Sequence, residues 1–249
     1  MTASTALCAI GSPSWPAYVP ADDEIQIVRL ALDEHGDGAE LIPMLDADEL
    51  KRAAGFRFDR DRRRFTVAHG LTRHVLGSIL GVFAARVNFR REPEGKPRLD
   101  DDHRNVRFNL SHSGERAVLA VTSGRDVGID LEREHSLEVL AFARLFFAPG
   151  ERLALEVTPP GERLGAFFKV WTRKESFIKA IGTGLSFPLA GFHVSLDDDA
   201  DQLLLDCRAA PWQLHRWTMT NVPWDPGYAA AITVEGTGWQ PTYWNFTHC

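Results

Sequence analysis

The hydrophobic residues of this chain follow two periods, one of two residues and one of three to four. Residues 127–132 alternate between apolar side chains and small or acidic ones, which predicts a strand. The two carboxylates of this strand, Asp130 and Glu132, would project from the same face about 7 Å apart. Residues 162–181 carry apolar side chains three and four positions apart, which predicts a helix.

Glu175 lies within the apolar stripe of this predicted helix. At about 100° per residue, its side chain projects within roughly 20–60° of Phe168, Trp171 and Ile178. Lys179 follows one turn later. A carboxylate among apolar side chains is costly unless it is paired or binds a cation. Two interpretations are therefore open: a surface ion pair between Glu175 and Lys179, or a cation site.

The first half of the chain is predicted to contain a strand, two helices and a hairpin. Residues 24–30 form the strand, and a hairpin is expected around residues 113–116. Asp46 or Asp48 can cap the first helix, and the second helix begins at Asp59. The apolar side of the second helix is expected to be buried.

The second half repeats this order of strand, helices and strands. Its helices are predicted near residues 137–147, 151–157 and 162–181, and its later strands near residues 192–196, 202–208, 212–220 and 228–235. Residues 90–103, rich in charge, Pro and Gly, are predicted to form a loop. The repeated order predicts an α+β protein of two related subdomains, residues 1–124 and 125–249.

Composition limits the class of protein. The chain has 249 residues, 44% of them hydrophobic, and can bury a substantial core. It has no apolar run near 18 residues, and residues 1–20 lack the positive charge that begins a secretory signal. Cys8, Cys207 and Cys249 are scattered and odd in number, which argues against zinc and disulfides. We therefore expect a cytoplasmic protein without a membrane partner.

The charge of the chain is unevenly distributed. The formal net charge is −6, but residues 51–125 contain 17 Lys and Arg against 8 Asp and Glu, so this segment carries +9 and the rest −15. A basic region within an acidic protein indicates a particular anionic partner. Bulk nucleic-acid binding is disfavoured, because the whole chain would be repelled by a polyanion.

Four segments in this order resemble 4′-phosphopantetheinyl transferases of the Sfp type. They are EGKPRL (94–99), FNLSHSG (108–114), GIDLE (128–132) and WTRKESFIK (171–179). The resemblance runs from about residue 46 to about residue 192. It implies a pseudo-dimer of two similar α+β subdomains, with antiparallel sheets and packed helices, that binds coenzyme A in the cleft between them. A two-halved chain of this kind is expected to complete its site as a monomer.

The resemblance also implies a reaction. A serine of an apo acyl or peptidyl carrier protein would attack the β-phosphorus of coenzyme A and release adenosine 3′,5′-bisphosphate. Asp130, Glu132 and Glu175 are oxygen donors of the kind that Mg²⁺ prefers. Lys179 would contact the same phosphates, and Glu175 is expected as ligand, as base for the serine, or as both.

Further residues are expected to contact coenzyme A because matching segments line its site in similar enzymes. They are Arg52, Arg64, Gly95, Lys96, Pro97, Asn109, Ser111, His112, Asp130 and Lys179. One departure stands out, because Glu49 occupies a position where some relatives carry a basic residue. Residues 182–189, which follow the predicted helix, are expected either to contact the carrier protein or to be a Gly-rich helix end.

Two other functions use the same residues. A metal-dependent phosphohydrolase of coenzyme A or of nucleotide pyrophosphates would need the same carboxylates, with water in place of serine. A non-catalytic coenzyme A-binding module would bind without turnover. Release of bisphosphate from coenzyme A alone distinguishes the hydrolase from the transferase.

Overall fold

The computed structural model describes residues 4–8, 18–100, 105–198, 200 and 202–248, and the chain divides into two compact units. The first unit comprises Met1–Arg90, Arg98–Gly124 and Gln240–Cys249, and the second comprises Arg91–Pro97 and Arg125–Trp239. The boundary predicted near residue 124 coincides with one of these divisions. Two segments, 91–97 and 240–249, lie on the other side of it.

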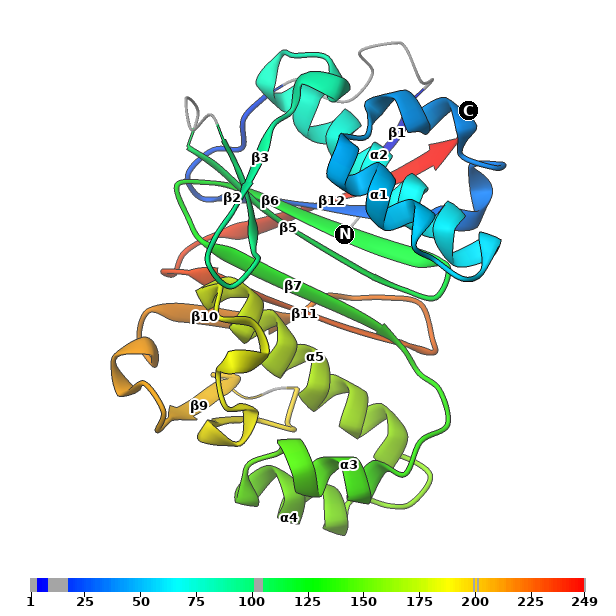
Figure 1. Cartoon of the computed structure of the whole chain (residues 1–249). Coiled ribbons are helices and arrows are strands. Elements are labelled where there is room, and N and C mark those ends of the chain that lie inside the picture. The colour runs from blue at the N-terminus through cyan, green and yellow to red at the C-terminus, as the bar shows by residue number, and fades with distance from the viewer. Residues whose placement is uncertain (1–3, 9–17, 101–104, 199, 201, 249) are drawn as a thin grey trace. The chain divides into compact units, whose positions relative to one another are not determined.

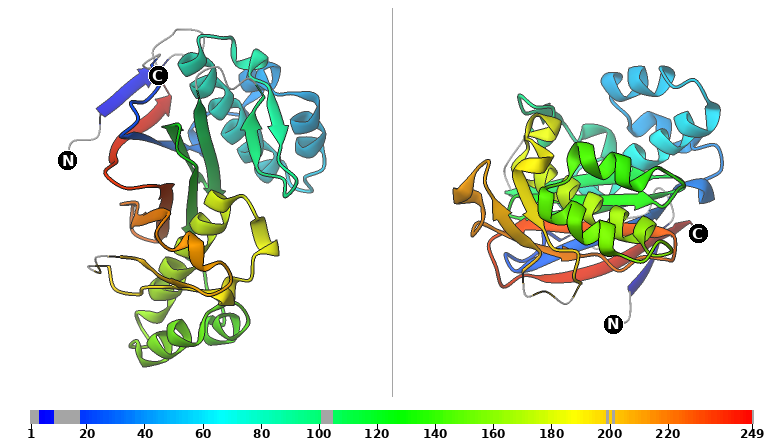
Figure 2. Two further views of the ribbon diagram at one scale, coloured as in Figure 1. Left: turned by 90° about the vertical axis from the view of Figure 1, so that its left-hand side faces the viewer. Right: turned by 90° about the horizontal axis from the view of Figure 1, so that it is seen from below.

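The first unit is built on a five-stranded sheet in the order β1-β12-β2-β6-β5 (Figure 1). Its strands are β1 (Ser4–Cys8), β2 (Glu24–Ala31), β5 (Val106–Ser113), β6 (Arg116–Ser123) and β12 (Gln240–His248). Strands β2, β6 and β5 are antiparallel, as predicted. Strand β12 runs parallel to both β1 and β2, and β1 and β12 lie side by side in Figure 2. These two parallel pairings were not predicted, because they join opposite ends of the chain.

The predicted hairpin in this unit is confirmed. Ser113 pairs with Arg116, so Gly114 and Glu115 form a two-residue turn between β5 and β6. Gly114 has φ +59°, a left-handed conformation that the first turn residue of a type II′ hairpin requires. The turn thereby holds the alternate residues of β5 in register with those of β6.

Two helices, α1 (Ala47–Ala54) and α2 (Asp59–Leu80), belong to the first unit, and α2 packs its apolar side on the sheet (Figure 1). Side chains at alternate positions of β2, β5 and β6 meet those of α2 in one buried cluster, whose members include Val28, Leu30, Leu71, Val75, Phe108 and Leu119. The predicted start of the long helix at Asp59 is confirmed.

Glu49 is part of a buried ionic network that fixes α1 to α2. The Asp46 side chain accepts a hydrogen bond from Glu49 N at 2.9 Å, and Glu49 Oε2 accepts one from Asp46 N at 3.1 Å. Arg73, 1% exposed, donates to Glu49 at 2.5 Å and also to Asp46. Burial opposes ionisation of Glu49, but His69 and Arg73 outweigh it and hold its pKa below the usual value. The acidic residue at this position therefore has a structural role.

The second unit pairs an antiparallel sheet with a long helix. The sheet has the order β10-β11-β7, with β10 at Trp217–Asn221, β11 at Tyr228–Glu235 and β7 at Val127–Arg133. Helix α5 (Arg163–Ile181) lies along it, and α3 (Val139–Phe146) and α4 (Pro149–Val157), which precede α5 in the chain, lie below α5 in Figure 1. A small sheet pairs β8 (Phe192–Val194) with β9 (Leu204–Cys207). The predicted helices and strands of this half are thus present, with β10 beginning five residues later than expected.

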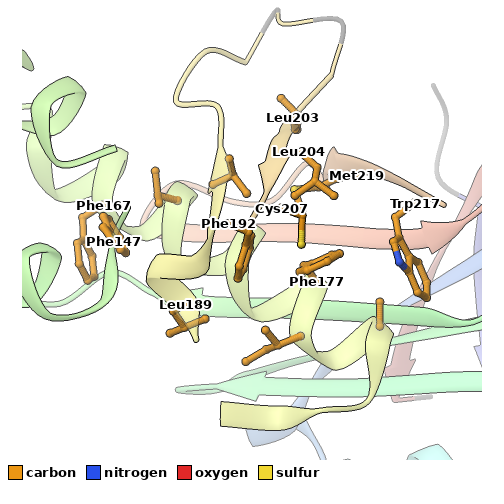
Figure 3. Packing of buried hydrophobic residues seen from close by; sticks show 14 of the residues in the cluster. Phe147, Phe167, Phe177, Leu189, Phe192, Leu203, Leu204, Cys207, Trp217 and Met219 are labelled. Atoms are coloured by element: carbon orange, nitrogen blue, oxygen red, sulfur yellow. The ribbon is translucent and has the colours of Figure 1, made fainter. Parts of the chain in front are cut away.

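Aromatic side chains from α5 form the core of the second unit. The Phe177 ring is tilted against Phe192, with ring centroids 4.8 Å apart, and lies nearly perpendicular to the ring of Trp217, with centroids 6.4 Å apart (Figure 3). Cys207 lies in the same cluster as a buried thiol. In the part of the chain that the structure describes, no helix is both long enough and apolar enough to cross a membrane.

The segment predicted to be a loop at 90–103 contains a short hairpin instead. Strands β3 (Phe89–Arg91) and β4 (Pro97–Leu99) form a two-stranded sheet, and residues 101–104 lie outside the described residues. The sequence signal at residues 90–103 was ambiguous because Pro and Gly mark both loops and tight hairpin turns.

Short 3-10 helices lie at Leu32–Glu34, Ala39–Met44, Ala84–Arg86, Gly184–Ser186, Leu189–Gly191 and Pro211–Gln213.

The network around Arg73 generates a stability prediction. Replacing a buried member of an ion pair leaves an unpaired charge and costs about 3–5 kcal/mol. We expect Arg73→Met to lower the free energy of unfolding by that amount, measured by urea denaturation. Arg60→Met, which removes an arginine whose side chain is 64% exposed, should change it by less than about 0.5 kcal/mol. Equal effects for the two variants would contradict the assignment.

Candidate active site

The close packing of α5 on β7 begins at Gly128. A Cβ at Gly128 would lie 2.1 Å from Ser176 O and 2.2 Å from Ala180 N, so only glycine fits there. Side chains two residues apart on a strand share a face, so Asp130 follows Gly128 on the side that meets α5. The sequence thus places the acidic face of β7 against the helix that carries Glu175.

Asp130 and Lys179 form an ion pair across this contact. The Lys179 Nζ lies 2.5 Å from Asp130 Oδ1, and the Asp130 residue is only 2% exposed. The helix therefore supplies a cation to a carboxylate that burial would otherwise strongly disfavour. The surface ion pair between Glu175 and Lys179 considered from spacing alone is replaced by a pair between strand and helix.

Glu175 is the most perturbed carboxylate of this site. Burial, and after it the negative charge of Asp130, raises the pKa of Glu175 to about 7. Glu132 raises this pKa further, whereas Lys179 lowers it. The two strand carboxylates are thus close enough to Glu175 to repel it. A carboxyl group with a pKa near 7 can exchange a proton at neutral pH.

The carboxylates also bear on the expected Mg²⁺. Within the described residues, no three His, Cys, Asp or Glu side chains are grouped closely enough to hold a metal ion as they stand. The chemistry of the donor set nevertheless fits a hard divalent cation, because it is all oxygen and its mutual repulsion would be relieved by positive charge. Lys179 donates to the Oδ1 atom of Asp130, so a cation bound at that atom would compete with the ammonium group.

An apolar pocket of about 200 Å³ adjoins this site, lined by Glu132 and His135 together with Leu137, Phe142, Phe167, Phe168 and Trp171. Trp171 lies one helical turn before Glu175 on α5. Sequence reasoning placed Phe168 and Trp171 on an apolar stripe, and such a stripe does not show which of its members border a cavity.

Two buried cations on α5 were missed by the sequence analysis. The Lys174 ammonium group lies 2.8 Å from each of Glu151 Oε1, Leu189 O and Phe192 O. Arg173 donates to Asn221 and, at 2.5 Å, to Asp198. Both residues are fully buried, so they anchor α5 on the side of β8 and β10. The available signal was that apolar residues stand three and four positions away on both sides, at Val170 and Phe177.

Lys96 was expected to contact coenzyme A. In the structure its side chain is largely buried, and its Nζ donates to Val127 O at 3.0 Å and Ala180 O at 2.9 Å. Gly95 adopts φ +89° in the turn before it, and Pro97 begins β4 after it. The structure thus brings Lys96 to the same β7 and α5 backbones that carry Asp130 and Lys179.

The residues of the first unit that were predicted to contact coenzyme A lie in different environments. The exposed Arg52 lies over the Phe65 ring, 5.0 Å from its centroid. Arg64 donates to both oxygens of Asp33, at 2.9 and 2.6 Å, and these hydrogen bonds hold the pKa of the Asp33 carboxyl below its usual value. Two further predicted contacts, Asn109 and Ser111, are buried at alternate positions of β5, and His112 beside them is exposed.

Comparison with known proteins identifies the family. Residues 126–233 match the model of the 4′-phosphopantetheinyl transferase superfamily, and residues 37–124 match that of the 4′-phosphopantetheinyl transferase N-terminal region. The chain belongs to the 4′-phosphopantetheinyl transferase superfamily. The predicted relationship is therefore confirmed, and the two matched regions meet at the boundary expected near residue 124.

Several curated members of this superfamily are similar over most of their length. The 4′-phosphopantetheinyl transferase HetI of Nostoc sp. is 35% identical over 238 residues, which cover 94% of this chain and 97% of HetI. The transferase psf-1 of Bacillus pumilus is 34% identical, covering 78% of this chain and 80% of its own. Sfp of Bacillus subtilis is 28% identical, covering 79% and 84%. The similarity therefore extends through both units.

The raised pKa of Glu175 predicts how the stability of this superfamily member depends on pH. Between about pH 4.5 and 7 the folded state binds this proton more tightly than the unfolded chain, so stability falls as pH rises through that window. Glu175→Gln should remove this fall, a difference on the order of 1–2 kcal/mol after solvent screening. Urea unfolding in the presence of a chelator measures it.

Glu156→Gln, an exposed change on α4, serves as the control and should keep the wild-type slope. Parallel pH profiles for wild type and Glu175→Gln would show that the Glu175 carboxyl has an ordinary pKa.

Proposed function

We propose that this protein transfers the 4′-phosphopantetheine group of coenzyme A to a serine of an apo acyl or peptidyl carrier protein. Adenosine 3′,5′-bisphosphate is the second product. The observation that carries the proposal is the meeting of Asp130, Glu175 and Lys179 at the contact of β7 with α5, in a chain that matches the superfamily in both halves. We propose that the protein acts as a monomer in the cytoplasm.

The proposed transfer makes one bond and breaks one. The serine oxygen of the carrier bonds to the β-phosphorus of coenzyme A, and the bond from that phosphorus to the bridging oxygen breaks. The bridging oxygen leaves with the α-phosphate as part of the bisphosphate product. The serine proton must go to a base, and negative charge grows on the leaving oxygen.

Glu175 is the proposed acceptor of the serine proton. Without a bound cation, its pKa of about 7 leaves a substantial fraction of the carboxyl group deprotonated at neutral pH. The deprotonated carboxylate is basic enough to accept a proton from a hydroxyl group. Positioned proton transfer of this kind contributes about 10²–10⁴-fold to a rate.

Asp130, Glu132 and Glu175 are also the proposed holders of Mg²⁺. When bound there, Mg²⁺ would neutralise charge on the pyrophosphate. Lys179 lies 2.5 Å from Asp130 at the contact of β7 with α5, which supports the proposal that its ammonium group acts on the phosphates of coenzyme A. We expect Lys179 to exchange Asp130 for a phosphate oxygen and to stabilise the leaving oxygen.

Binding of coenzyme A is proposed to use further residues. The guanidinium of Arg52 is exposed and held over Phe65, a position from which it can meet a phosphate. His112 is exposed at the end of β5, and Asn109 and Ser111 precede it on alternate positions. Arg64 would reach a phosphate only by leaving Asp33. The apolar pocket at Trp171 is suited to the uncharged pantetheine arm.

The carrier protein is proposed to contact the segment after α5. Residues 182–189 leave the helix at Gly182, with φ +76°, and Ser186 and Pro188 within the segment are exposed. These exposed residues follow α5 soon after Lys179, which supports the proposal that the carrier serine approaches here.

A direct assay tests the function. Several apo carrier proteins are incubated with the protein, coenzyme A and Mg²⁺, and mass spectrometry measures the gain of one phosphopantetheine. Release of bisphosphate from coenzyme A without any carrier would indicate a hydrolase instead. Binding of coenzyme A with neither product would indicate a non-catalytic module.

Glu175→Ala should abolish transfer while the protein stays folded, because the proposed base and one oxygen donor are lost together. We expect the rate to fall by at least about 10²-fold. Glu156→Ala is the matched control, since it removes an exposed glutamate from α4. A folded Glu175→Ala protein that loads a carrier at the wild-type rate would refute the mechanism.

Asp130→Ala should lower activity and raise the Mg²⁺ concentration needed for half-maximal rate. The physical reason is the loss of one carboxylate from a set of three oxygen donors. Titration of the transfer rate with MgCl₂ measures the effect. An unchanged Mg²⁺ dependence would remove Asp130 from the proposed ligand set.

A further inference from the structure

Lys96 connects the two elements that carry the candidate active site. Its Nζ donates to Val127 O on β7 at 3.0 Å and to Ala180 O on α5 at 2.9 Å, and the residue is 8% exposed. Val127 immediately precedes Gly128, where the two backbones touch, and Ala180 immediately follows Lys179. The hydrogen bonds of Lys96 therefore bridge β7 and α5 beside the contact at Gly128, which sets the distance between the acidic strand and the helix.

The turn at residues 92–96 places the Lys96 side chain at the end of α5. Glu92 N donates to Lys96 O at 2.9 Å, and Gly95 N donates to Glu92 O at 2.8 Å, so the turn after β3 is closed. Gly182 ends α5 with φ +76°, and a Cβ there would lie 3.4 Å from Lys96 Cδ and 3.0 Å from a Glu92 oxygen. The absence of a side chain at Gly182 leaves room for the turn to pack on the end of the helix.

Electrostatics favours a cation at this place. The last carbonyl groups of a helix lack partners within the helix and carry partial negative charge. Ala180 O is one of them, and Lys96 supplies it with a charged donor. If Lys96 turned to a phosphate, both carbonyls would be left in a buried place without this donor, which is unfavourable.

We propose that Lys96 is a positioning residue, which holds α5 against β7 and so sets the geometry of Glu175 and Lys179, and that it is not a phosphate ligand. The proposal rests on the proposed function, because the geometry that it sets is that of the transfer site. It reassigns a residue that the family resemblance placed among the coenzyme contacts.

Lys96→Met tests the proposal, because it keeps the aliphatic stem and removes the donor. A displacement of catalytic groups by about 1 Å can cost 10²-fold in rate. We expect kcat to fall by about 10- to 100-fold while KM for coenzyme A changes by less than about 2-fold. Lys96→Arg, which can still donate to both carbonyls, should recover most of kcat.

Arg91→Met is the matched control in the same hairpin. Arg91 is an exposed cation that donates to Gly95 O at 3.2 Å, and its loss should leave both kinetic constants within about 2-fold of wild type. A Lys96→Met protein whose KM for coenzyme A rises about 10-fold at unchanged kcat would overturn the proposal and make Lys96 a phosphate ligand.

Hydrogen exchange tests the same idea without turnover. In Lys96→Met, amides near residues 178–182 and 127–129 should exchange faster, whereas those of α2 in the first unit should not change. Unchanged exchange at the α5 end would overturn the positioning role even if the rate fell. If the wild-type protein loaded no carrier, the proposed function would fail, and this measurement would still decide whether Lys96 holds α5.

Discussion

The candidate site depends on one contact between backbones, where α5 crosses β7 at Gly128. With Ser176 O only 2.1 Å from a hypothetical Cβ, any side chain there would separate helix and strand. Glycine in a strand interior weakens the strand and commonly marks such an approach. The approach brings Asp130 within 2.5 Å of Lys179 and brings Glu175 under the influence of two further carboxylates. The proximity of these charged groups therefore follows from the packing of α5 on β7.

Some charged residues of α5 anchor the helix, and others belong to the candidate active site. Arg173 and Lys174 are saturated with carbonyl and carboxylate partners, so they hold the helix on one side. At Glu175, the next residue, Lys179 compensates only in part, and burial together with Asp130 raises the pKa. Glu175 thus differs in role from Arg173 and Lys174, because successive side chains on a helix point about 100° apart.

The basic excess of residues 51–125 has a partly structural explanation. Arg73 lies buried in the network with Glu49 and Asp46, and Lys96 donates to backbone carbonyls. Arg64 is paired with Asp33. These three cations are engaged within the protein, so the charge available to an anionic ligand is smaller than the composition of the segment indicates. Arg52, exposed over Phe65, is a better candidate for such a ligand.

The sequence by itself determined the elements whose signals are local. Alternation along 127–132 defined β7, spacing defined α5, and the motifs defined the superfamily, since each depends on residues near one another in the chain. Tertiary structure alone decided the parallel pairing of β12 with β1 and β2, the burial of Arg173 and Lys174, and the partners of Lys96. These features join distant segments, and no periodicity within either segment encodes the partner that it meets.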